Sequence, residues 1–283
     1  SNGTIYTWGQ NTDGRLGDGT ANTYLAQPVA MRAGENNVAT DAVTIRKPNY
    51  LSPDVTDRDE RYQPNEFFSN AAAAAGGNDQ TLVLRMKQAL DGTADTSLFA
   101  LGANGEGQLA MPTSTTRILL PTLVLAAGSG TVGLAGGTAS TLGEQGEYIV
   151  GIEASRSYSG MRTVKLGDTV KENQADSERS YAYTWGYNNR GQLGIGNTTR
   201  QSLPTRVLKG EYEQHNDAYT YLEGVYDLAL GSYHALSIDM YLKNGTAFEN
   251  DGILDGRFGY IWGWGNNSTT ATGDTVLSQL SKL

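Results

Sequence analysis

The stretch AYTWGYNNRGQLGIGNTTRQSLPTRVL, residues 182–208, is the most complete copy of a unit that the chain repeats. Three further copies begin at Ile5, Leu98 and Tyr260, and the last of them is the most degenerate. Self-similarity of this kind is typical of repeat architectures, in which one supersecondary unit is used several times. The unit therefore decides the fold, and the other segments can be placed relative to it.

Each complete unit contains a Trp-Gly step, a glycine in the loop that follows, a leucine two residues later and a closing proline. The aligned residues are Trp8, Leu101, Trp185 and Trp262 for the step, Gly14, Gly107 and Gly191, then Leu16, Leu109 and Leu193, then Pro28, Pro121 and Pro204. The aromatic and aliphatic run before the step predicts a strand. The Asn- and Gly-rich loop predicts a sharp turn with positive φ angles. We expect the leucine to fill a gap between neighbouring sheets and the proline to lie on an edge strand.

A second landmark alternates with the first and reads AAAAAGGNDQTLVL from Ala71, VGLAGGTASTL from Val132 and VYDLALGSYHALSI from Val225. Its paired positions are Gly77 and Leu82, Gly137 and Leu142, and Gly231 and Leu236. The pattern predicts a strand of small residues, a tight turn and a second strand. The alanine run has helix propensity, but the two glycines that follow favour a strand. Small residues suit the innermost strand of sheets arranged around an axis. The sequence therefore predicts an all-β chain of four-stranded antiparallel blades, which is a β-propeller.

The segments WGYNNRGQLGIGNTTRQSLPTRV and LALGSYHALSI together resemble the repeat of the regulator of chromosome condensation family. That family's pattern is Trp-Gly, Asn, Gly-Gln-Leu-Gly and a later Pro, followed by Ala-x-Gly-x-x-His, whose histidine matches His234. The resemblance implies a seven-bladed propeller, yet only about 3.5 repeats are visible, so we expect a propeller or a partial one. The remaining blades could come from absent parts of the same chain, from poorly matched segments inside the insertions, or from a second copy. We favour absent parts of the same chain as the source. A symmetric dimer that completes the ring is second, because every half-unit of one copy would find its complement in the other.

We interpret residues 1–283 as a single propeller region with insertions at 32–69, 86–97, 143–180, 209–224 and 239–258. Two of these follow the proline strand, and the other three precede a Trp-Gly strand. We expect the two kinds of connection to open on different faces. Long loops on a rigid scaffold are where specificity usually resides.

Composition excludes several classes of function. The formal charge of -9, with no clustered Lys and Arg, argues against a nucleic-acid partner. No apolar run is long enough to span a membrane. The absence of cysteine excludes disulfides, thiolate metal sites and cysteine nucleophiles. The low charge and the many Thr, Asn, Gly and Tyr residues suit an extracellular or cell-surface bacterial protein. The start at Ser1, without a methionine, predicts a processed or excised piece.

Two insertions carry candidate binding residues. Exposed tyrosines among acidic residues are a candidate recognition surface for protein or sugar, and these are Tyr212, Tyr219 and Tyr221. The alternative is that they pack the insertion onto its own blade. The densest carboxylate cluster, a weak calcium candidate, consists of Asp54, Asp57, Asp59 and Glu60. Its spacing does not match an EF-hand loop, and neighbouring arginines favour a solvated loop with internal ion pairs.

No residue pattern indicates catalysis or a cofactor. We interpret His234 as a structural hydrogen-bonding residue rather than a catalyst. The sequence is thus interpreted as a non-enzymatic interaction module that presents insertion loops to a protein or surface polymer. Two alternatives remain open. One is a polysaccharide-acting enzyme with a carboxylate pair between insertions. The other is a structural subunit of an extracellular filament or layer.

Overall fold

The computed structural model describes residues 3–33, 67–88, 94–127, 131–134, 141–145, 147–165, 180–209, 221–242, 257–266 and 276–282. Within these ranges there are sixteen strands and no helix. The all-β prediction is therefore confirmed. Because no described residue is helical, no helix in this part of the chain could cross a membrane.

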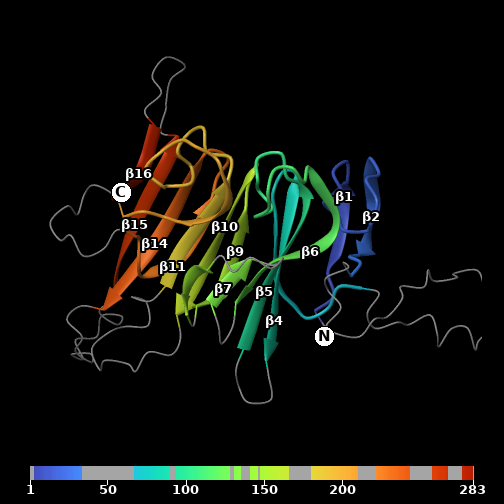
Figure 1. Cartoon of the computed structure of the whole chain (residues 1–283), viewed down its shortest axis with the longest axis horizontal. Helices are drawn as coiled ribbons and strands as arrows, with labels where there is room; N and C mark the ends of the chain where they lie inside the picture. The colour runs from blue at the N-terminus through green and yellow to red at the C-terminus, as the bar shows by residue number, and fades with distance from the viewer. Residues whose placement is uncertain are drawn as a thin grey trace, which may run out of the picture.

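The strands form consecutive antiparallel sheets that lie side by side, from the half-blade at one end to the third blade at the other (Figure 1). The half-blade consists of β1 (Tyr6–Gln10) and β2 (Tyr24–Ala30). The first blade consists of β3 (Ala71–Gly76), β4 (Gln80–Gln88), β5 (Ala94–Ala103) and β6 (Arg117–Ala127), extended by β7 (Thr131–Leu134) and β8 (Thr141–Gln145). The second blade consists of β9 (Glu147–Ala154), β10 (Tyr158–Lys165), β11 (Ser180–Gly186) and β12 (Gln201–Arg206). The third blade consists of β13 (Val225–Leu230), β14 (His234–Leu242), β15 (Arg257–Asn266) and β16 (Val276–Lys282).

Each full blade is a meander whose outer hairpin is the Trp-Gly unit, and in the first and third blades the inner hairpin is the second sequence landmark. The alanine run forms the inner strand β3, as its glycines predicted. Four-stranded sheets repeated in this way are the blades of a partial β-propeller. Apolar clusters lie between successive sheets, so that each blade is stabilised mainly by its neighbours.

The inner hairpin of the second blade is not where the sequence placed it. Residues 132–142 were expected to form it, but β7 and β8 instead extend the first blade beyond β6. The inner hairpin is β9–β10, inside the predicted insertion 143–180. Its turn carries Ser155 where the other two turns carry Gly77 and Gly231. All three turns close with the same hydrogen bond, as in Ser155 N to Tyr158 O.

The last repeat is also shifted by two residues. In the first and second blades the glycine of the Trp-Gly position has a φ near 100° and pairs with the first residue after the inner turn, as Gly186 does with Tyr158. In the third blade the residue that pairs with His234 is Gly265. The repeat tryptophan is therefore Trp264, and the assignment of Trp262 to that position was wrong.

The register shows that both kinds of insertion leave the scaffold at one face. The start of β1 pairs with the end of β2, at Tyr6 and Ala30, and the same holds for β11 and β12 at Tyr183 and Arg206. The end of each outer hairpin thus lies beside the connection that joins an inner hairpin to an outer one (Figure 1). The expectation of two different faces was wrong, because a four-strand meander brings both connections to the same side. We call this side the insertion face.

Candidate functional site

In the half-blade and the first two blades, the loop after the Trp-Gly position is fixed by a buried asparagine three residues beyond the tryptophan position. The side-chain oxygens of Asn11, Asn104 and Asn188 each accept a hydrogen bond 3.0 Å long from the backbone N–H of Leu16, Leu109 and Leu193 respectively. Their amide groups donate to carbonyls later in the loop. All three leucines are buried, and Leu109 packs with the second blade. The expectation that this leucine fills the gap between sheets is confirmed for that loop.

The residue after each of these leucines adopts a left-handed backbone. Gly17 and Gly194 have φ angles of 70° and 64°, but the first blade has Ala110 there with a φ of 58°. Because a Cβ atom is strained in this region, we expect Ala110→Gly to raise the free energy of unfolding by about 0.5–1 kcal/mol. Urea denaturation measures this change. The matched control Ala103→Gly lies in a strand and is expected to lower stability by about 0.5–1 kcal/mol; a loss at both sites would contradict the assignment.

In the second and third blades, a tryptophan side chain joins the blade to the loop of the blade before it. Trp185 Nε1 donates to the carbonyl of Gln108 at 2.9 Å, and Trp264 Nε1 donates to the carbonyl of Gln192 at 2.9 Å. Both rings are buried. The hydrogen bond and the burial together define the joint between two full blades, and in both of these joints the following blade supplies the tryptophan.

A second series of hydrogen bonds runs between the inner turns. Gln80 Nε2 donates to the carbonyls of Ser155 and Tyr158, at 3.0 and 3.1 Å. Tyr158, at the same position of the next blade, donates through its hydroxyl to the carbonyls of Gly231 and His234, at 2.6 Å each. Burial raises the pKa of Tyr158, so its hydroxyl stays protonated as a donor. His234 is the third member of this series. Its exposed imidazole has no hydrogen-bond partner among the described residues.

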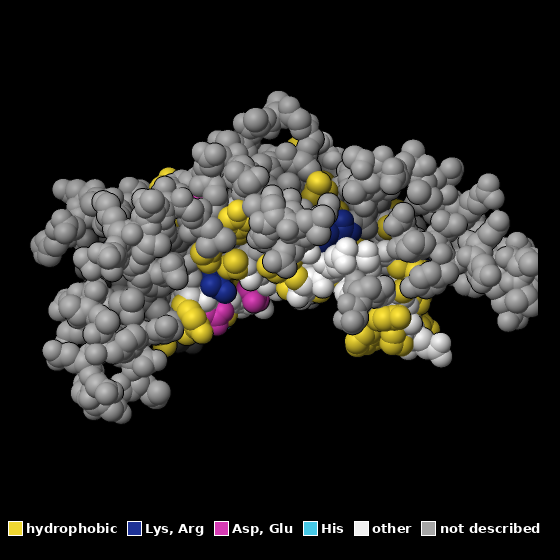
Figure 2. Space-filling view, turned by 90° about the horizontal axis from the view of Figure 1, so that it is seen from below, with side chains coloured by type: hydrophobic (Ala, Val, Ile, Leu, Met, Phe, Trp, Pro, Cys, Tyr) yellow, Lys and Arg dark blue, Asp and Glu magenta, His cyan; other side chains and the backbone are white. Residues whose placement is uncertain are grey.

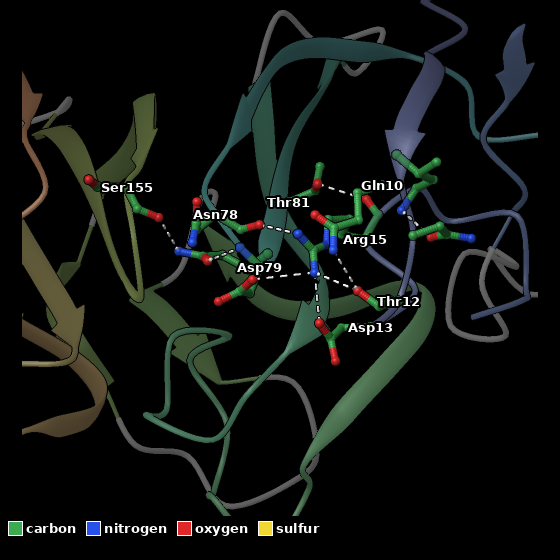
Figure 3. A network of polar contacts seen from close by, with 11 residues as sticks. Gln10, Thr12, Asp13, Arg15, Asn78, Asp79, Thr81 and Ser155 are labelled. Atoms are coloured by element: carbon green, nitrogen blue, oxygen red, sulfur yellow. Dashed lines mark hydrogen bonds and ion pairs between the residues drawn. The ribbon is translucent and has the colours of Figure 1, made fainter. Parts of the chain in front are cut away.

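The half-blade is joined to the first blade through Arg15 (Figure 3). Its guanidinium pairs with Asp13 at 2.7 Å within its own loop and with Asp79 at 3.3 Å in the first inner turn. Thr81 Oγ1 donates to the Arg15 carbonyl at 2.8 Å. The adjacent Gly14 packs so closely that an added Cβ would lie 2.9 Å from Leu119 Cα. An outer hairpin alone is therefore sufficient to make a packed, polar joint.

The end of the array formed by the half-blade exposes aromatic residues that are buried elsewhere. Tyr6 and Trp8 are 59% and 63% exposed. The residues at the same repeat positions, Tyr183 and Trp185 in the second blade and Trp262 and Trp264 in the third, are 0–2% exposed. Hydrophobic side chains gather at this end of the molecule in Figure 2. We call the surface containing Tyr6 and Trp8 the leading face.

The opposite end exposes aliphatic residues. Leu236, Ile238 and Ile261 are 37%, 36% and 48% exposed. The residues at the same positions of the first blade are buried against the second blade, and they are Leu82, Leu84 and Leu98. We call the surface formed by Leu236, Ile238 and Ile261 the trailing face.

The predicted insertion sites are mostly outside the described residues. Tyr212, Tyr219, Asp54, Asp57, Asp59 and Glu60 lie there. Tyr221 is described and partly exposed, with its ring 5.4 Å from the guanidinium carbon of Arg206 on the second blade. Among the described residues, no group of three or more His, Asp or Glu side chains could hold a metal ion.

Two carboxylates lie across the joint between the second and third blades. Burial, with a smaller contribution from the Asp227 carboxylate, raises the pKa of Glu153. A raised carboxyl pKa means that the folded state favours the protonated form of the group. This contribution to the free energy of unfolding is complete at low pH and is lost as the pH rises through the folded pKa. The charged form therefore destabilises the fold at neutral pH.

We expect Glu153→Gln to be more stable than the parent at neutral pH by less than about 1 kcal/mol, since solvent screens a half-exposed pair. The difference is expected to vanish below about pH 3.5, where Glu153 is protonated and, like glutamine, uncharged. Thermal melting at the two pH values measures it. Glu106→Gln, which removes a charge from the exposed ion pair with Arg200, is the contrast and is expected to show no gain in stability at neutral pH. An advantage for Glu153→Gln that persists at low pH would contradict the electrostatic cause.

The repeats are similar to those of a known protein family. A family model described as the regulator of chromosome condensation (RCC1) repeat matches residues 2–45 and 181–238. These ranges include the half-blade and run from β11 into β14. The crystal structure of human WBSCR16 is 16% identical, with a TM-score of 0.42, and the match covers 99% of this chain and 66% of that chain. The chain spans less than two thirds of the length of WBSCR16.

Proposed function

We propose that this chain, which contains RCC1 repeats, is a non-enzymatic module that binds a protein or surface polymer through the insertion face of its propeller. The observation that carries the proposal is the strand register, which directs both kinds of long connection to one face. The opposite face carries the short inner turns and the Asn-fixed loops. Variable loops on one side of a rigid scaffold are a common arrangement for recognition.

The buried joints supply the rigidity that such a surface needs. Each joint combines apolar packing with hydrogen bonds from buried donors, as at Trp185 and Gln80. Fixed scaffolds lower the entropy cost of ordering a binding site. RCC1-repeat propellers generally act by binding proteins rather than by catalysis, and this supports the non-enzymatic class.

The test uses the whole chain with shortened insertions. Replacing 34–66 and 243–256 by short Gly-Ser linkers is expected to abolish binding of the partner captured from the native source, measured by calorimetry with the purified partner. Asn189→Ala and Thr12→Ala, on the opposite face, are the matched control and are expected to bind like the parent. Binding that survives loss of the insertions but fails in the control pair would overturn the proposal.

The rival class is an enzyme acting on polysaccharide, and the specific observation in its favour is the raised pKa of Glu153 beside Asp227. Hydrolysis of surface polysaccharides by the parent and by Asp227→Asn discriminates the two. The binding proposal expects no turnover in either protein. Turnover that is lost in Asp227→Asn would favour the enzyme.

A further inference from the structure

The two end faces of the array are the two sides of one kind of joint. Between the first and second blades, Leu82, Leu84 and Leu98 pack against Tyr183 and Trp185 in one buried cluster. The trailing face repeats the first set of positions with Leu236, Ile238 and Ile261, whereas the leading face repeats the second set with Tyr6 and Trp8. A surface of each kind is therefore exposed at opposite ends of the same molecule.

Each end of the array also has a side-chain hydrogen-bond donor without an acceptor among the described residues. Trp8 has no acceptor for its Nε1 among the described residues, although Trp185 and Trp264 both donate to a backbone carbonyl of the preceding blade. His234 occupies the position from which Gln80 and Tyr158 donate to the turn of the following blade. Each end thus presents one apolar face together with one unused donor.

From these equivalences we infer that a second copy of this chain docks head to tail, with its trailing face on the leading face of the first. The half-blade packs on the first blade with its outer hairpin alone, and the leading face is its other, exposed side. The contact is heterologous, since two different surfaces meet. It lies away from the insertion face, so it goes beyond the proposed binding function and can fail independently of it.

The hairpin count decides which assembly the contact can form. The described strands make four outer hairpins and three inner ones, so two copies carry eight outer and six inner hairpins. A seven-bladed ring needs equal numbers, and the expectation that every half-unit finds its complement in a second copy was wrong. Head-to-tail docking of two copies therefore does not complete a seven-bladed ring.

Complementation between two blocked variants tests the head-to-tail geometry. Trp8→Glu removes the leading face and Ile238→Glu removes the trailing face, and both side chains are exposed in the single array, so both variants are expected to fold and to melt cooperatively. Each alone is expected to sediment as a monomer, with association at least about a hundredfold weaker than the parent, because docking would bury an unpaired carboxylate. An equimolar mixture retains one intact face on each partner and is expected to form a one-to-one complex.

The sedimentation outcomes separate the possible occupants. A parent chain that stays monomeric at the highest soluble concentration overturns the inference and leaves the faces to further blades or to another protein. A complex formed by Ile238→Glu alone but not by Trp8→Glu overturns it as well, because two leading faces would then be pairing. Asn189→Glu, an added charge away from both faces, is the control and is expected to associate like the parent.

Discussion

Replacing Glu147 by alanine is expected to lower the free energy of unfolding by about 3–5 kcal/mol, because it leaves a partly buried arginine without its ion-pair partner. Glu147 is fully buried and accepts hydrogen bonds from Tyr183 Oη at 2.8 Å and Thr163 Oγ1 at 3.0 Å. It also pairs with Arg206, whose guanidinium carbon lies 4.0 Å from the ring centre of Tyr181. One carboxylate thus ties the first strand of the second blade to the last.

Equilibrium urea denaturation measures the effect. Glu106→Ala, which breaks the exposed ion pair with Arg200, is the matched control and is expected to cost less than about 1 kcal/mol. If Glu147→Ala does not fold, Glu147→Gln keeps the volume and an acceptor oxygen and is expected to show a smaller loss. Equal, small losses at Glu147 and Glu106 would show that the buried network contributes little.

Truncating Trp185 is expected to destabilise the chain by about 3–5 kcal/mol, whereas the same change at Trp8 is expected to change stability by less than about 0.5 kcal/mol. The two residues occupy the same repeat position. Trp185 is buried and hydrogen-bonded to the preceding blade, but Trp8 is 63% exposed. The difference therefore isolates the contribution of the joint from that of the residue type.

Thermal and urea unfolding of Trp185→Ala and Trp8→Ala, at a concentration where the parent is monomeric, measures this contrast. Trp185→Phe, which keeps an aromatic ring but loses the donor to Gln108, is expected to fall between the parent and Trp185→Ala. A large loss at Trp8 in the monomer would mean that the leading face is covered within a single chain.

The fold could be predicted because the residues that identify each repeat lie close together in the sequence. The Trp-Gly step, the buried asparagine and the loop glycine serve the same turn in each copy, so their spacing survives wherever that turn does. The second-blade inner hairpin was missed because Ser155 and Tyr158 replace the glycine and histidine that mark the turn in the third blade. The backbone hydrogen bond of the turn is kept, but it does not depend on the side chains and so cannot be recognised in the sequence.

The shift from Trp262 to Trp264 has a different cause. The segment WGWG offers two Trp-Gly steps, and both tryptophans are buried. Only the pairing of Gly265 with His234 separates them. The joint hydrogen bonds could not be predicted, since they connect residues that are far apart in the chain, 72 positions in the case of Trp264 and Gln192. The common face of the insertions could have been deduced from the strand order alone.

The state of Trp8 in solution tests the central claim, that the leading face is the unfilled side of a blade joint. Subtracting the emission of Trp8→Phe from that of the parent isolates its fluorescence from the three buried tryptophans. In the monomer we predict red-shifted emission that acrylamide quenches readily, and we predict a blue shift with protection as the concentration rises and copies associate. Blue-shifted, protected emission from a dilute monomer would contradict the account.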